Sequence, residues 1–109
     1  RTFKTHGELM SDYYKIDTTI SNTKFKGLSI QKLWKQEHAE ILYISLEKGS
    51  IFPEHDSPRN AMLQMLEGQI VFYIADKEYM IKENESFQFP AKEIHSVSAI
   101  QNSKFLIIR

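Results

Sequence analysis

Two histidines in this chain stand in similar positions relative to proline, which makes them the first candidates for chemistry. His55 follows Pro53, and His95, forty residues later, follows Pro90. Each histidine lies just before or within a run typical of a β-strand, so both rings can lie on one inner wall of a β-barrel. Histidine is the commonest side-chain ligand of transition metals and a common general acid or base. The pair therefore predicts a metal site or an acid–base site; the alternative is a hydrogen-bonded pocket pair without a metal.

From residue 24 onward, the chain predicts a succession of short β-strands that would position these histidines. Turn signals separate the predicted strands, among them Gly68 and the segment 75–78, and Pro53 is expected at a strand end. Short strands separated by turns at this spacing are typical of an all-β sandwich or barrel. The predicted strands cover residues 28–34, 41–46, 62–65, 70–74, 79–81, 87–89, 95–100 and 104–108.

The first 22 residues do not continue the strand pattern. Within residues 8–15, apolar and aromatic side chains recur at roughly helical spacing, which predicts either a short helix or an arm lying against the domain. A chain of 109 residues has the length of one domain. We therefore interpret residues 1–22 as a short N-terminal arm or helix that belongs to the same domain as the barrel predicted over residues 23–109.

Composition excludes several classes of protein. Fourteen basic residues balance fourteen acidic ones, so no net positive field favours nucleic acid or an anionic membrane. The chain has no cysteine, which excludes a disulfide scaffold and a thiolate metal site. The longest apolar run, residues 70–75, is far shorter than the roughly 20 residues of a membrane span, and the N-terminus does not resemble a signal peptide. We expect a cytoplasmic protein that binds neither nucleic acid nor membranes.

Around the two histidines, the sequence resembles the cupin superfamily of small jelly-roll barrels. Gly49, five intervening residues and His55 match the start of the first cupin motif, and Leu66-Glu67-Gly68 matches its end. The spacing from Pro90 to His95 matches the second motif. The resemblance covers residues 49–99 and implies an all-β fold: a cupin-type jelly-roll β-barrel of antiparallel strands.

Several metal-ligand positions that the resemblance implies have changed residue type. The second histidine of the first motif is Ser57 here, and the glutamate position is Ala61. Only His55 and His95 keep a metal-binding side chain, so they are the candidate ligands of one divalent transition metal such as zinc, iron, manganese, nickel or copper. Stable sites usually have three or four protein ligands, so two imidazoles predict weak binding.

The small residues at positions 57 and 61 leave space in the predicted pocket. An organic ligand or ordered water could fill that space, or Leu63 and Met65 could repack it. Strict alternation from position 61 directs Leu63 and Met65 inward and Gln64 outward, whereas a bulge would reverse this and make Gln64 a third ligand. The predicted pocket residues are Ser57, Ala61, Leu63, Gln64 and Met65.

Other polar residues near the motifs are expected to face solvent. Alternation turns Glu54 and Asp56 away from whatever His55 faces. Arg59 could anchor an anionic ligand at the rim, but a single loop arginine is more often solvated. His6 and His38 lie outside both motifs and are interpreted as surface residues. The chain also contains no nucleophile elbow, phosphate-binding glycine loop or His-Glu-x-x-His motif.

Two functions of different classes are compatible with these residues. In the first, the barrel binds a small organic molecule oriented by His55 and His95, with or without a weakly held divalent metal. In the alternative, it is a metal-dependent enzyme of the dioxygenase or isomerase type that acts on a small organic substrate. In either case we expect a two-fold homodimer, because sheet edges and apolar outer faces of such a barrel need cover, which the region of Trp34 and the arm with Tyr13 and Tyr14 could supply.

Overall fold

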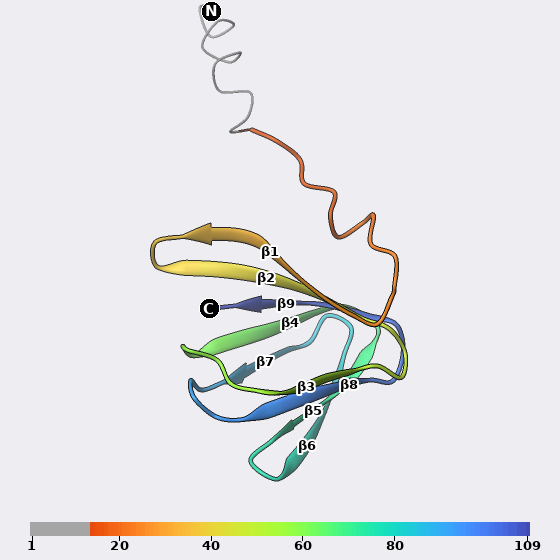
Figure 1. Cartoon of the computed structure of the whole chain (residues 1–109), viewed down its shortest axis with the longest axis vertical. Helices are drawn as coiled ribbons and strands as arrows, with labels where there is room; N and C mark the ends of the chain where they lie inside the picture. The colour runs from red at the N-terminus through yellow and green to blue at the C-terminus, as the bar shows by residue number, and fades with distance from the viewer. Residues whose placement is uncertain (1–13) are drawn as a thin grey trace, which may run out of the picture.

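The chain forms two antiparallel β-sheets that share one core, as seen in a computed structural model that describes residues 14–109 (Figure 1). This arrangement confirms the predicted all-β jelly-roll fold. Over residues 14–109 the structure has nine strands and no helix, and therefore none that could cross a membrane. The larger sheet has the order β1 (Leu28–Gln36), β2 (Ala39–Leu46), β9 (Ser103–Ile108), β4 (Ala61–Glu67) and β7 (Ser86–Phe89), and the smaller sheet has the order β3 (Ile51–His55), β8 (His95–Ala99), β5 (Gln69–Ile74) and β6 (Lys77–Lys82).

The two sheets bury a common hydrophobic core. Side chains alternate along the strands, so that in β4 the residues Ala61, Leu63 and Met65 are buried while Met62 and Gln64 are less so. The predicted inward direction of Leu63 and Met65 is therefore confirmed. The buried core cluster comprises Ile44, Leu46, Ala61, Leu63, Met65, Ile70, Phe72, Ile74, Ile81, Phe89, Val97, Ala99, Phe105 and Ile107.

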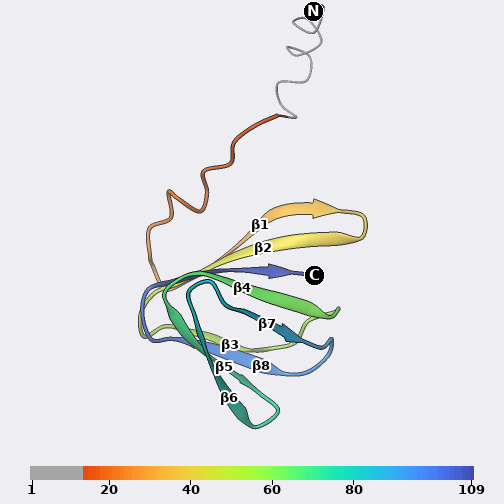
Figure 2. The same ribbon diagram turned by 180° about the vertical axis from the view of Figure 1, so that it is seen from behind.

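One end of the barrel gathers the segments that build the candidate site. The β1–β2 turn, the β3–β4 and β7–β8 connections and the end of β9 all lie at the left of Figure 1 and at the right of Figure 2, which shows the molecule from behind. We call this end the mouth. The β5–β6 hairpin extends away from the rest of the smaller sheet in both views.

The segment that precedes β1 is tied to the barrel by polar contacts. Residues 19–22 form a turn, in which the backbone N–H of Asn22 donates to the carbonyl of Thr18 at 3.0 Å. From β9, the ammonium of Lys104 donates to the carbonyl of Ile20 at 2.9 Å. The predicted helix over residues 8–15 lies mostly outside the described residues; at Tyr14 and Lys15, which are described, the chain is not helical.

The hairpin between β5 and β6 is tighter than the sequence predicts. We expected a turn over residues 75–78, but only Ala75 and Asp76 form it, and β6 already begins at Lys77. Both turn residues have positive φ, 53° and 60°. Two successive left-handed residues are the geometry of a two-residue hairpin whose twist matches that of the flanking strands. Sequence alone misses it because the usual Asn-Gly or Asp-Gly signal is absent.

Pro53 lies inside β3 rather than at its end, and this correction matters for the site. Strand β3 is at the edge of its sheet, where a residue without an N–H costs no ladder hydrogen bond. The register along β8 shifts between Phe52, which pairs with Val97, and His55, which pairs with His95. The extra residue is a β-bulge, and it brings Phe52 and His55 to the same side of the strand.

Candidate ligand-binding site

A cavity of about 310 Å³ opens between the two sheets at the mouth. The smaller sheet contributes the histidines, which are direct cross-strand partners on β3 and β8. Strands β1, β2 and β9 of the larger sheet contribute most of the apolar wall. The residues lining the cavity are Ile30, Leu42, Ile44, Phe52, His55, Asp56, Ser57, Phe89, His95, Ile107 and Arg109. Six of these eleven are aliphatic or phenylalanine, so the cavity suits a ligand with an apolar body.

The structure brings the two motif histidines together inside an aromatic cluster. The ring centroids of His55 and His95 are 4.2 Å apart, and the ring planes are inclined by 67°. Because of the bulge in β3, Phe52 stacks on His55 with centroids 4.0 Å apart. His95 packs against Phe72 and Phe89 at 5.1 and 4.7 Å, and its exposed fraction is only 3%. These contacts on both rings fix their orientation.

Each histidine uses the same ring nitrogen to bond to the backbone. The Nδ1 atom of His55 lies 2.7 Å from the carbonyl oxygen of Pro53, and that of His95 lies 2.8 Å from the carbonyl oxygen of Glu93. A carbonyl oxygen can only accept, so Nδ1 carries the proton in both rings. In the neutral rings, Nε2 then keeps its lone pair. The site therefore offers two hydrogen-bond acceptors, or two ligand atoms, from neighbouring rings.

Burial keeps His95 in this neutral form. Its pKa is lowered from the usual value of 6.5, chiefly because burial penalises the charged ring. The hydrogen bond to the Glu93 carbonyl opposes this shift, and the proximity of His55 adds to it. At neutral pH the imidazole of His95 is therefore unprotonated at Nε2, which is the state that can accept a hydrogen bond.

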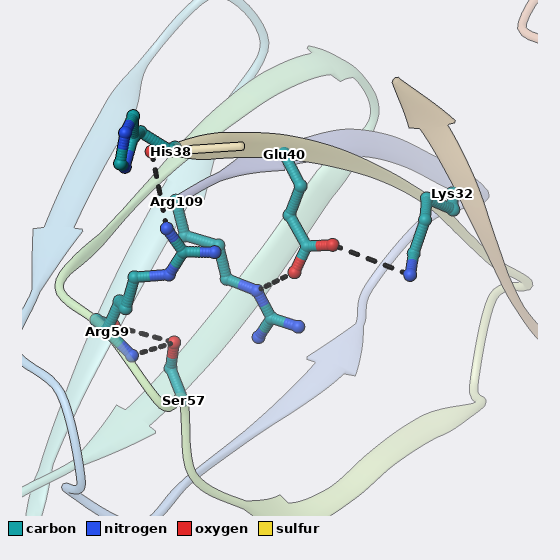
Figure 3. A network of polar contacts seen from close by, with 6 residues as sticks. All are labelled: Lys32, His38, Glu40, Ser57, Arg59 and Arg109. Atoms are coloured by element: carbon teal, nitrogen blue, oxygen red, sulfur yellow. Dashed lines mark hydrogen bonds and ion pairs between the residues drawn. The ribbon is translucent and has the colours of Figure 1, made fainter. Parts of the chain in front are cut away.

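Ser57 also lines the cavity, but its hydroxyl is already engaged. It is buried, its Oγ donates to the carbonyl of Arg59 at 2.7 Å, and it accepts a longer bond from the Arg59 N–H (Figure 3). These bonds close the loop that follows β3. At a position where the cupin motif would have a histidine, the Ser57 side chain thus stabilises the loop that forms this wall of the cavity.

The other four predicted pocket residues do not line this cavity. Leu63 and Met65 are fully buried in the core, and Ala61 pairs with Phe89 across β4 and β7. Gln64 faces outward and donates through its amide to the Met65 carbonyl at 3.1 Å, so the bulge that would have turned it inward does not occur at this position. These four residues therefore lie in the core or on the outer face rather than in the wall of this cavity.

Aromatic packing explains why the cavity avoids β4. The rings of Phe72 and Phe89 lie 5.0 Å apart, and both contact His95. They occupy the barrel interior beside the histidines. The open space consequently lies on the other side, against β1, β2 and β9.

The cavity is also lined by two charged residues that the sequence prediction did not include, Asp56 and Arg109. Asp56 was expected to face away from His55, but it follows the end of β3, where strand alternation no longer applies. Arg109 follows β9, in which Ser103, Phe105 and Ile107 are buried in strict alternation. Extending that alternation by one step directs Arg109 inward, so a signal for it was present in the sequence.

Arg109 belongs to a small ionic network at the mouth. Its Nε donates to the Glu40 carboxylate at 2.7 Å, and the ammonium of Lys32 lies 3.6 Å from the other oxygen of the same carboxylate (Figure 3). Glu40 is buried, with an exposed fraction of 6%. The hydrogen bond from Arg109 is the main cause that lowers the pKa of the Glu40 carboxyl, against the opposing effect of burial. Glu40 is therefore ionised at neutral pH.

The donor set does not fit a resident catalytic metal. Over residues 14–109, no three histidine, cysteine or carboxylate side chains lie close enough together to hold an ion. Ala61 has no donor atom, and the Ser57 hydroxyl donates to the backbone. Two imidazoles alone fall short of the three or four protein ligands of a stable site.

The chain is a small jelly-roll barrel of the double-stranded β-helix type. Its two antiparallel sheets face each other, and an apolar cavity with a pair of histidines opens at the mouth. A family model described as the cupin domain matches residues 42–108, and the chain belongs to the cupin family. This membership confirms the resemblance seen in the two motifs. Among curated proteins, none matches the chain.

Solved structures show the same fold. An RmlC-like cupin protein from Desulfovibrio desulfuricans superposes with a TM-score of 0.77 at 18% identity, covering 87% of this chain and 94% of that one. An RmlC-like cupin with a double-stranded β-helix fold from Methanocaldococcus jannaschii gives 0.76 at 21% identity, covering 88% and 89%. A conserved protein of unknown function from Streptococcus pyogenes gives 0.74 at 24%, covering 87% and 84%. At these identities the likeness extends to the fold alone.

Proposed function

We propose that this cupin binds a small, mainly apolar organic molecule in its mouth cavity, oriented by His55 and His95. The observation that carries the proposal is the shared tautomer of the two rings. Both Nδ1–H groups are held by backbone carbonyls, so both Nε2 atoms offer a lone pair to a ligand. A hydroxyl or amine of the ligand can donate to either nitrogen, whereas a group that only accepts hydrogen bonds cannot.

The walls of the cavity support the same proposal. Apolar side chains from both sheets surround the space, and its volume of about 310 Å³ is near the lower end of the ~300–1,000 Å³ typical of ligand pockets. The aromatic contacts of both histidines prevent the rings from reorienting, so little ordering is needed when a ligand binds. A small ligand with an apolar body and one donor group satisfies these features.

Titration with octanol tests the proposal, because this alcohol combines an apolar chain with a single hydroxyl donor. We expect it to shift the NMR resonances of residues that line the cavity. His55→Phe combined with His95→Phe keeps two aromatic rings in the cluster but removes both acceptors. Octanol donates one hydrogen bond, and a neutral hydrogen bond contributes about 0.5–1.5 kcal/mol, so the dissociation constant should rise about two- to tenfold in the double variant.

His38→Phe is the matched control, since its side chain is 89% exposed and lies outside the cavity. It should bind octanol like the wild type. The proposal fails if octanol leaves the cavity resonances of the wild type unchanged, or if the control loses as much affinity as the double variant.

The metal-dependent enzyme remains a prediction that metal analysis can test. The two imidazoles could hold a divalent ion weakly, but residues 14–109 bring no third histidine, cysteine or carboxylate close enough to complete the site. Metal analysis of protein purified without a histidine tag tests this prediction. Near-stoichiometric metal that disappears when either His55 or His95 is substituted would favour a metal-dependent enzyme over a barrel that only binds an organic molecule.

A further inference from the structure

Arg109 gives the mouth cavity a cation on the wall opposite the histidines. The histidines belong to the sheet formed by β3, β8, β5 and β6, whereas Arg109 continues β9 of the other sheet. The side chain of Arg109 is 20% exposed, so its charge is largely removed from bulk water. A cation in such a place is normally paired.

The pairing of Arg109 within the protein is incomplete. Glu40 offers one negative charge, and this charge is shared by two cations, Arg109 and Lys32. The three side chains together therefore carry one net positive charge. Asp56 is the other charged residue that lines the cavity, but it is exposed at the rim, where water screens it.

The guanidinium also has unused hydrogen-bond donors. Only its Nε bonds to another group among the residues that the structure describes, namely to the Glu40 carboxylate. A guanidinium carries five N–H donors, so the Nη atoms keep four. Figure 3 shows this end of the side chain extending beyond Glu40. Because the backbone of Arg109 is bonded in both directions to that of Glu40, the side chain starts from a fixed position.

We infer that the ligand is a small organic acid whose carboxylate is bound by Arg109, an inference that rests on the proposed function. A carboxylate can accept two parallel hydrogen bonds from the Nη atoms, which is the geometry in which arginine binds it most strongly. Its charge would complete the pairing that Glu40 leaves unfinished. The apolar body would then lie against Leu42 and Ile107, and any hydroxyl of the ligand would point toward the histidine acceptors.

Comparing octanoate with octanol tests this inference, because the two probes share the chain length and differ in charge. In the wild type, octanoate should bind more tightly than octanol; added salt should weaken octanoate binding only modestly, because a partly buried ion pair is screened less than an exposed one. In Arg109→Gln, we expect octanoate to lose about tenfold or more in affinity, since hydrogen bonds between charged groups contribute more than neutral ones. Octanol should change by less than about twofold.

Two further variants complete the design. Arg59→Gln is the matched control, because Arg59 donates to the His38 carbonyl and does not line the cavity, and it should bind both probes like the wild type. Arg109→Lys keeps the charge without the paired donors, so it should retain part of the octanoate affinity even if Arg109→Gln folds poorly.

The outcomes separate the inference from the proposed function. If octanol binds but octanoate binds no better, or if the octanoate affinity is unchanged in both Arg109→Gln and Arg109→Lys, the inference is overturned and the proposed function stands. If neither probe binds, both are overturned.

Discussion

Among the three described glycines, Gly68 at the β4–β5 turn is the one where an added methyl group should damage the fold most. Its φ is +88°, and a Cβ built on it would clash with the carbonyl oxygen of Asn102, lie 2.5 Å from the Ser103 hydroxyl and 2.8 Å from the Ser103 Cα. These neighbours are mostly backbone atoms and cannot move without shifting the β8–β9 connection. We therefore predict that Gly68→Ala is strongly destabilising.

The size of the effect follows from two contributions. The left-handed conformation costs a residue with a Cβ roughly 1–2 kcal/mol relative to glycine. Displacing Ser103 also weakens its bonds to the N–H of Gln69 at 3.1 Å and to the carbonyl of Gln101 at 2.8 Å, each worth about 0.5–1.5 kcal/mol. We expect a total loss of about 2–5 kcal/mol, which is a large part of the 5–15 kcal/mol typical of a domain.

Gly49→Ala separates the steric contribution from the conformational one. Gly49 has a similar φ of +84°, but a Cβ there would meet open space, so only the conformational cost of roughly 1–2 kcal/mol applies. Equilibrium urea unfolding of the two variants gives both values, provided that the slope of the transition is unchanged. Equal losses at the two positions would refute the close packing of Gly68 against the β8–β9 connection.

Three further predictions concern the site and its surroundings. The free energy of unfolding should fall as the pH drops below about 6.5, because the lowered pKa of His95 lets the unfolded chain bind the proton more readily than the folded one. His95→Phe should remove part of that slope in urea titrations at several pH values, and an unchanged slope would contradict it. Glu40→Gln should lower the free energy of unfolding at pH 7 by about 1–2 kcal/mol, because Arg109 and Lys32 lose their shared anionic partner. An unchanged free energy in urea unfolding would count against the network. We also predict a homodimer, because Trp34 on the edge strand β1 is 47% exposed. Light scattering should give a mass of about twice 12.8 kDa, and Trp34→Glu should reduce that mass. A monomeric wild type would refute the dimer.

Much of the fold could be predicted from the sequence because its local signals agree with one another. The alternation of Ala61, Leu63 and Met65 correctly gives the inward face of β4. The spacing from Gly49 to His55 and from Pro90 to His95 correctly identifies the cupin barrel, and in it the two histidines become neighbours. These features depend on strand period and motif spacing, which are properties of the chain itself.

The shape of the cavity could not be predicted in the same way, because it depends on packing between distant strands. Phe72 and Phe89 fill the interior beside His95, and this moves the open space away from β4 and the predicted residues there. The bulge beside Pro53 brings Phe52 onto His55; the proline is compatible with a strand end, an edge strand or a bulge, so it does not by itself fix this stacking. Arg109 is the exception, since alternation along β9 already directed it inward.

The position of the proton on each of the two imidazole rings decides whether the proposed binding mode is right. Long-range nitrogen–proton NMR of labelled protein at neutral pH, with and without octanol, reports which ring nitrogen carries the proton and whether the other accepts a hydrogen bond. We predict protonated Nδ1 in both His55 and His95, and a shift of at least one Nε2 resonance when octanol is added. Protonation at Nε2 in both rings would contradict a site built from two imidazole acceptors. So would Nε2 resonances that stay unshifted while octanol binds.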